Sequence, residues 1–288
     1  MAIQGRNGKI KGKINNIVYR SYRDKQVLQI LPDRVRQTYA TKLAALEFGL
    51  ASIQAKILRR ILCNFVGEYD GKMAVRLNAA VLECLRTSQR EVGERTLHDA
   101  DLGGLKGFQF NANAPIERLV KVRPSIDLAP NGQIRIALPR FNVMSDLVYP
   151  KEPQRFVPCF FITVAAFNFF EESLHIIDYA SFEFTGDNQE AEIDWLCSRQ
   201  LPKGSMVFIT LALSYVHTNW VGQRQVTKDS AFSPSIILDA FHVTDAMASK
   251  GAEDGLETPK EAMPCDDIFT RKLREIAYFK KKYAKNAR

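Results

Sequence analysis

The chain of 288 residues is 46% hydrophobic and 25% charged, with a formal net charge of +8, which is typical of a globular protein with a real hydrophobic core. Its first residues lack the apolar stretch of a secretory signal, and no apolar run reaches the roughly eighteen residues of a membrane span. Its five scattered cysteines, without C-x-x-C or zinc-ligand spacing, favour buried free thiols over a disulfide framework. We therefore expect a cytoplasmic protein without membrane insertion or cofactors.

The first 36 residues are predicted to form a basic arm with a β-hairpin. Residues 5–13 are rich in Gly and Lys and cannot build a core, so we expect them to be flexible until a partner binds. Two β-prone runs, Lys13–Tyr22 and Gln26–Pro32, flank a polar break and predict the hairpin. A lone hairpin is marginally stable in water, so it must pack on the rest of the chain or on a partner.

Residues 37–106 are predicted to be helical. Apolar residues at three- and four-residue steps predict an amphipathic helix over Thr38–Phe65 and a second one from Met73 to about Arg90. The two are expected to pair as an α-hairpin. The first stripe is nearly heptad but persists for only about three heptads, which favours packing within the chain over a dimeric coiled coil.

Residues 107–245 are predicted to form an antiparallel β-sandwich of Greek-key or immunoglobulin-like type. The runs that predict its strands are Gln133–Leu138, Cys159–Phe167, His175–Phe184, Glu192–Cys197, Met206–His217 and Ser235–Val243. Short turn signals separate the runs and no helical pattern intervenes. The predicted fold class is therefore α+β, with an N-terminal β-hairpin and an α-hairpin followed by this sandwich.

The C-terminal part is predicted to contain a linker and a basic helix. Residues 246–264 combine small, charged and proline residues without periodicity, which predicts the linker. Residues 265–288 alternate apolar and basic residues at helical spacing, which predicts a short amphipathic tail helix. Residues 1–36 contain nine basic and two acidic residues, and residues 271–288 contain eight basic and one acidic residue. Each end therefore has a net charge of +7, which leaves a net charge of −6 for residues 37–270. Such asymmetry is typical of interaction arms.

The candidate catalytic groups follow no strong pattern. His98, Asp99 and Asp101 could bind a divalent metal or hold a base, but a polar connection between a helix and a strand explains them better. Cys197 and His217 could meet across a sheet as nucleophile and base, although no family signature surrounds either. Nucleotide, flavin and zinc motifs are absent from the sequence. These observations favour a protein that is not an enzyme.

The basic ends are the candidate contact surfaces. Tyrosines and cations alternate along the hairpin and recur in the tail, a pattern that can stack on bases and neutralise phosphates. The candidate contacts for a partner protein or nucleic acid are Lys9, Lys11, Lys13, Tyr19, Arg20, Tyr22, Arg23, Lys25, Lys280, Lys281 and Lys282. The same arm could instead bind the acidic body of a neighbouring copy, remain solvated or fold back.

The N-terminal third resembles an uncharacterised bacterial family. The run Gly12-Lys13-Ile14-Asn15-Asn16-Ile17-Val18-Tyr19 and the extended run ending at Pro32 match a "GK-x-GN-x-V" hairpin followed by a proline. In this chain and in the family, the proline is followed by a helix, here Thr38 to Leu62, which includes Phe48-Gly49-Leu50-Ala51-Ser52. Asn15 stands where the family usually has glycine. The resemblance covers about the first hundred residues and implies a helix followed by a β-sandwich, with no activity and no site residues.

Three functions remain open from the sequence. The first is a structural or assembly protein, either a homo-oligomer or part of an assembled particle, whose arm and exposed strands dock on neighbouring subunits by β-augmentation. Its arm-to-body contacts would be charge-complementary and weakened by salt. The second is a nucleic-acid-binding protein in which Tyr19 and Tyr22 stack on bases. The third is an enzyme that works around His98 and Asp101.

Overall fold

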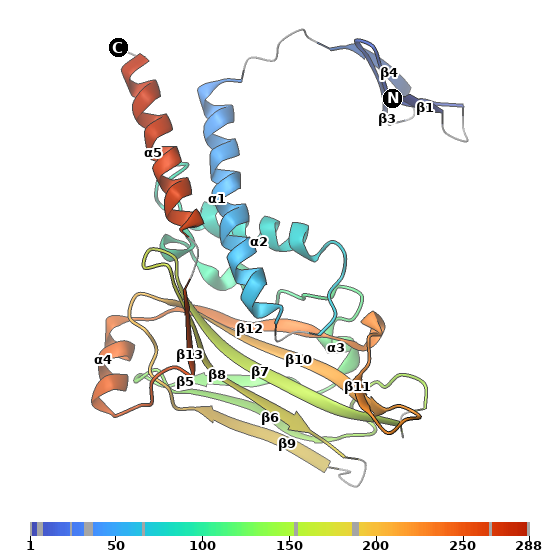
Figure 1. The fold of residues 1–288 in the computed structure, drawn as a ribbon, viewed down its shortest axis with the longest axis vertical. Helices are drawn as coiled ribbons and strands as arrows, with labels where there is room; N and C mark the ends of the chain where they lie inside the picture. Colours follow the sequence, from blue (N-terminus) through green and yellow to red (C-terminus); the bar gives the residue numbers. More distant parts are fainter. Residues whose placement is uncertain are drawn as a thin grey trace. The chain divides into compact units, whose positions relative to one another are not determined.

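The computed structural model describes residues 2–4, 8–23, 25–31, 37–64, 67–152, 155–185, 190–264 and 267–286 (Figure 1). The chain divides into two compact units, Met1–Lys42 and Leu43–Arg288. The division falls near the start of helix α1 (Tyr39–Leu62), a few residues beyond the predicted boundary at residue 36. The predicted α+β class is confirmed.

The N-terminal unit is a four-stranded antiparallel sheet with its strands in chain order: β1 (Ala2–Gln4), β2 (Ile10–Ile14), β3 (Ile17–Tyr22) and β4 (Lys25–Ile30). Left-handed backbone at Asn15 (φ 50°) and Arg23 (φ 51°) turns the chain after β2 and after β3. The predicted hairpin is confirmed as β3–β4, but a turn at Asn15 and Asn16 divides its first predicted run, Lys13–Tyr22, between β2 and β3. The segment expected to be flexible instead provides part of β2, because hydrogen bonds to β1 and β3 order a strand without a core of its own. Residues 5–7 of that segment lie outside the described residues.

The main unit begins with the two predicted helices. Helix α1 and helix α2 (Met73–Thr87) bury their apolar stripes, and α2 ends three residues earlier than its periodicity predicts. Short helical turns follow at η1 (Leu97–Asp99), η2 (Leu102–Leu105) and α3 (Ile116–Leu119).

Two antiparallel sheets follow. The larger has the order β11–β10–β7–β8–β13, with β12 also paired to β10, and the smaller has the order β5–β6–β9. The strands are β5 (Ser125–Leu128), β6 (Ile134–Asn142), β7 (Phe156–Asn168), β8 (Ser173–Glu183), β9 (Glu190–Cys197), β10 (Met206–Thr218), β11 (Arg224–Val226), β12 (Ser235–His242) and β13 (Glu261–Pro264). Each of the six predicted strands is present, and β5, β11 and β13 were not expected.

The main unit therefore has three layers. The helices pack on one face of the larger sheet against side chains such as Phe167 and Phe208, and the smaller sheet packs on the other face against Ile162 and Ile209 (Figure 1). Strands β7 and β10 are buried on both faces, which explains their nearly continuous apolar sequences.

The segment predicted to be a linker carries regular structure. It contains helix α4 (Asp245–Glu253) and strand β13, which pairs with β8, joined by residues 254–260. The Thr244 side chain caps α4 by accepting a hydrogen bond from Met247 N–H. The linker prediction was wrong because composition does not show that a short strand can complete the edge of a sheet formed elsewhere.

The predicted tail helix is α5 (Ile268–Asn286). Phe269 and Ile276 are each 1% exposed and belong to the core formed by α1 and α2. A Cβ atom placed on Gly49 of α1 would lie 3.1 Å from Cε of Lys272. The tail helix thus folds back on its own body, an arrangement that the sequence left open.

Candidate functional site

The N-terminal sheet holds most of the predicted contact residues, and its register separates them onto two faces. Side chains alternate along each strand, and partners across strands share a face. Gly12, Tyr19 and Leu28 face one side, whereas Lys13, Val18 and Gln29 face the other.

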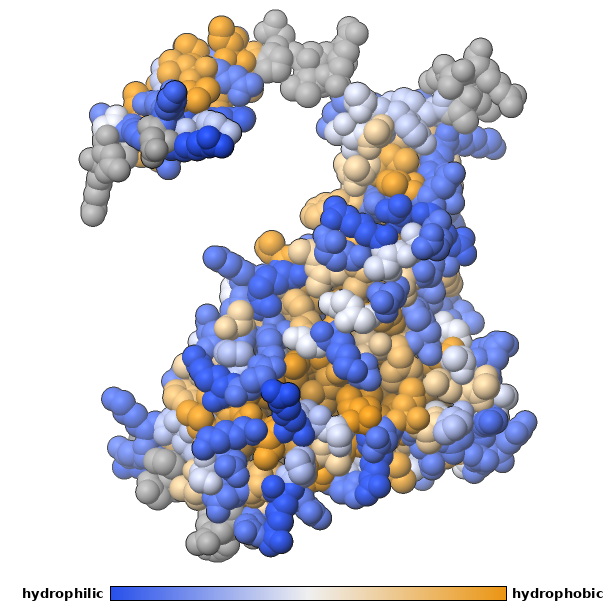
Figure 2. All heavy atoms as spheres, turned by 180° about the vertical axis from the view of Figure 1, so that it is seen from behind, coloured by the Kyte–Doolittle hydropathy of each residue, from blue (hydrophilic) through white to orange (hydrophobic). Residues whose placement is uncertain are grey.

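The first face, called here the uncharged face, has no Asp, Glu, His, Lys or Arg among the described strand residues. Its members are Ala2, Gln4, Ile10, Gly12, Ile14, Ile17, Tyr19, Ser21, Gln26, Leu28 and Ile30. Ile14, Ile17 and Ile30 lie side by side across β2, β3 and β4, and they are 47%, 38% and 75% exposed. Leu28 is 59% exposed in the next row. Figure 2 shows the apolar side chains of this unit gathered on one side and its hydrophilic side chains on the other.

The opposite face, called here the cationic face, holds all the cations of the four strands. Its members are Ile3, Lys11, Lys13, Val18, Arg20, Tyr22, Lys25, Val27 and Gln29. Tyr22 is 64% exposed, and the Arg23 guanidinium lies 5.5 Å from the centre of its ring. This face combines several positive charges with one accessible aromatic ring.

The register divides the predicted contact set. Arg20, Tyr22 and Lys25 share the cationic face, but Tyr19 points to the uncharged face. The stacking platform expected from Tyr19 and Tyr22 together is therefore not formed, because residues at odd spacing on one strand face opposite sides. Arg23 lies in the turn after β3, and Lys9 immediately precedes β2.

The C-terminal lysines also differ from one another. Lys281 and Lys282 are exposed. Lys280 points inward, with its Nζ 2.7 Å from Oε1 of Glu94 and 3.6 Å from Oε2 of Glu91. Burial alone would lower the pKa of Lys280, but the hydrogen bond and charge of Glu94, helped by Glu91, raise it above its ordinary value. Lys280 is thus a structural anchor of α5 and not an available contact.

The histidine and carboxylates considered for catalysis have structural partners. His98 accepts a hydrogen bond at Nε2 from Phe169 N–H (3.1 Å), and burial lowers its pKa to about 4. Asp99 forms an ion pair with Arg90 at 2.8 Å, and Asp101 accepts a hydrogen bond from Gly103 N–H. No group of three His, Cys, Asp or Glu side chains that could hold a metal ion occurs in the described part of the chain.

Cys197 and His217 lie on different sheets. Cys197 ends β9 in the smaller sheet, where burial raises the pKa of its thiol to about 12. His217 lies near the end of β10 with its ring 5.6 Å from that of Phe156. Within the described residues no hydrogen bond or ion pair joins them, so the nucleophile–base pair considered from the sequence is not formed.

An ion-pair network that the sequence did not predict joins three parts of the main unit. Asp178 of β8 lies 2.5 Å from Nζ of Lys260 and 3.3 Å from Nε of Arg199, which also pairs with Glu257 at 2.9 Å. The network joins three segments that are far apart in sequence, represented by Asp178, Arg199 and the neighbours Glu257 and Lys260, and no local pattern connects them. The network ties the segment before β13 to β8 and β9.

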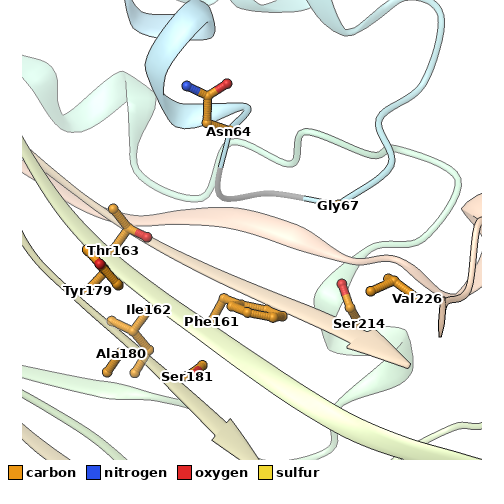
Figure 3. A pocket seen from close by; sticks show the side chains of 10 residues that line it. All are labelled: Asn64, Gly67, Phe161, Ile162, Thr163, Tyr179, Ala180, Ser181, Ser214 and Val226. Carbon is orange, nitrogen blue, oxygen red and sulfur yellow. The ribbon is translucent and has the colours of Figure 1, made fainter. Parts of the chain in front are cut away.

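A cavity of about 360 Å³ lies on the helix-facing side of the larger sheet (Figure 3). Strands β7, β8 and β10 contribute Phe161, Thr163, Ser181 and Ser214, and Asn64 lies beyond the end of α1. None of the described residues lining this cavity has an acidic or basic side chain. Its polar groups are the amide of Asn64 and the hydroxyls of Thr163, Tyr179, Ser181 and Ser214.

Comparisons with protein-family models, with curated proteins and with solved structures found no match, so the resemblance of the N-terminal third stays a prediction. Among the helices of the described residues, none is long and apolar enough to cross a membrane.

Proposed function

We propose that this chain is a non-enzymatic assembly protein of the cytoplasm that self-associates through the uncharged face of its N-terminal sheet. The observation that carries the proposal is a single-layer sheet with Ile14, Ile17, Leu28 and Ile30 exposed on a face without charge. Burying a side chain of this size stabilises a complex by about 1.5–3 kcal/mol when the burial is complete. A sheet of this kind gains most from a second apolar layer.

A second copy of the chain is the partner that fits this face best. In a two-fold contact the same face meets itself, and two sheets pack about 10 Å apart. The cations of both copies, including Lys11, Lys13 and Arg20, then point outward to water. Placing the uncharged face against a charged surface would instead remove charges from water without a partner.

The size of the face sets the expected strength. Four strands spaced about 4.8 Å apart, each about five residues long with a rise of about 3.4 Å per residue, cover an area of roughly 300 Å² on the uncharged face of each copy. Two copies together would bury roughly 600 Å², which is less than the roughly 1,000 Å² of a stable specific interface, so the dimer is expected to be weak and concentration-dependent.

A charge-swap experiment in the full-length chain tests the proposal. Leu28→Lys and Leu28→Glu should each abolish the concentration-dependent mass seen by light scattering, because each places like charges face to face. An equimolar mixture of the two should restore it, since Lys then meets Glu. Val27→Lys changes the neighbouring residue on the cationic face and should leave association intact.

A wild-type chain that is monomeric at every concentration would contradict self-association. Association that persists in both Leu28 variants would show that the contact lies elsewhere on the molecule.

A nucleic-acid function is the second candidate, favoured by the cationic face with its exposed Tyr22. Nuclease-treated protein should then bind an added oligonucleotide, and Lys11→Gln with Lys13→Gln should weaken binding and reduce its salt dependence. Binding that is unchanged in this double variant would remove the cationic face from consideration.

A further inference from the structure

Helix α5 separates its charges into a paired inner set and an unpaired outer set. On the inner side Lys280 lies 2.7 Å from Glu94, and Lys272 lies 2.7 Å from Glu275, which is itself 56% exposed and borders the outer side. On the outer side the exposed cations are Arg271, Arg274, Lys281 and Lys282. Among the described residues, none of these four cations has a carboxylate partner.

The outer cations form a stripe along one side of the helix. At 3.6 residues per turn, residues 271, 274, 278, 281 and 282 fall within an arc of about 100°, and residues 271 and 282 are about 16 Å apart along the axis. Tyr278 lies within this stripe and is 69% exposed. Its neighbour Phe279 is turned inward, with its ring 4.5 Å from that of Tyr283. The stripe thus presents four cations around one accessible aromatic ring.

We propose that this outer stripe of α5 binds single-stranded nucleic acid, with the four cations facing phosphates and Tyr278 stacking on a base. Cations along a groove or ridge neutralise the phosphate backbone, and exposed aromatic rings add stacking that tolerates any base. A membrane surface fits less well because the apolar side of α5, including Phe269 and Ile276, is buried and cannot insert between lipids. The inference does not depend on self-association, since α5 lies outside the N-terminal unit.

The salt dependence of binding tests the four cations. Fluorescence anisotropy would follow a labelled oligodeoxythymidylate of about 20 nucleotides with nuclease-treated full-length protein. Four phosphate contacts on a single strand predict a slope of about −2.8 in log affinity against log salt, which is a loss of about 50-fold between 50 and 200 mM. Arg271→Gln with Arg274→Gln should reduce that slope by about 1.4. Arg271→Gln alone should reduce the slope by about 0.7, whereas Lys280→Gln, which removes one charge from the inner side, should leave it unchanged.

The aromatic contact is tested separately. Tyr278→Ala should weaken binding about tenfold at every salt concentration without changing the slope, and Tyr278→Phe should restore it. A slope that is insensitive to Arg271 and Arg274 would overturn the proposal. Polyglutamate that displaces the protein from the oligonucleotide as well as unlabelled oligonucleotide does would also overturn it, because it would indicate an acidic protein partner. Light scattering of the same variants shows whether self-association persists, so a failure here is distinct from a failure of the assembly proposal.

Discussion

The imidazole of His98 is held neutral by its surroundings. The rings of Phe169 and Phe170 lie 5.7 and 4.7 Å from it, and Phe169 N–H donates to Nε2. With a folded-state pKa of about 4 against 6.5 when unfolded, the unfolded chain takes up a proton first as the pH falls. The contribution of His98 to stability is therefore complete above about pH 6.5 and is lost as the pH falls toward 4.

Urea unfolding measured between about pH 7.5 and pH 4.5 checks this contribution. The free energy of unfolding should fall by roughly 2 kcal/mol more in the wild type than in His98→Gln, which keeps an acceptor but does not titrate. Taking the difference removes the share of other groups, such as His175, whose pKa burial also lowers. Identical pH dependence in the two proteins would show that His98 is free to protonate in the folded state.

Two Asp–Arg pairs of this chain differ in exposure and in geometry, since Arg135 donates to both oxygens of Asp194 whereas Asp178 is shared between Arg199 and Lys260. The side chains of Asp178 and Arg199 are 12% and 20% exposed, whereas those of Asp194 and Arg135 are 46% and 56% exposed. Asp178→Asn takes the carboxylate away from Lys260 and leaves Arg199 paired with Glu257 alone, and it should cost about 3 kcal/mol. Asp194→Asn should cost less than about 1 kcal/mol because water screens the exposed pair. Equal losses in urea unfolding would refute the structural role of the Asp178 network.

At the scale of elements, the attachment of α5 depends on a glycine in the loop after α2. Gly93 has φ +84°, and a Cβ there would lie 2.8 Å from Leu43 and 3.1 Å from Ile276. Gly93→Ala should therefore lower the free energy of unfolding by about 2–4 kcal/mol, which combines backbone strain with overpacking. Gly107→Ala is the matched control, since Gly107 has φ +82° with no atom within 4 Å of a new Cβ, and should cost only about 1 kcal/mol. Thermal unfolding monitored by circular dichroism compares the stability losses of the Gly93→Ala and Gly107→Ala variants.

The elements that the sequence predicted correctly carry their own periodic pattern. The stripe of α1 and the apolar runs of β7 and β10 repeat the spacing of the structure they form. Strand β13 has only four residues and exists because β8 offers an edge, so no local signal could reveal it. The same reason applies to the contact residues: alternation along β3 separates Tyr19 from Tyr22, but composition groups them together. Arg271, Arg274 and Tyr278 were missed because only the packing of α5 shows which of its sides is outward.

For the molecule as a whole, the two proposed surfaces respond to salt in opposite ways. The chain carries +8, and in a two-fold contact through the uncharged face the like charges of two copies repel at low salt. Screening weakens that repulsion as the Debye length falls from about 10 Å at 0.1 M to about 3 Å at 1 M, while apolar burial persists.

Sedimentation of nuclease-treated protein from about 0.05 to about 0.5 M sodium chloride should show self-association that holds or tightens a few-fold. Binding of the oligonucleotide by α5 should weaken steeply over the same range. A dimer that dissociates as salt rises would instead mean that the arm binds through Lys11, Lys13 and Arg20 to an acidic surface. The uncharged face of the sheet would then still lack its partner, and the Leu28 variants would associate as the wild type does.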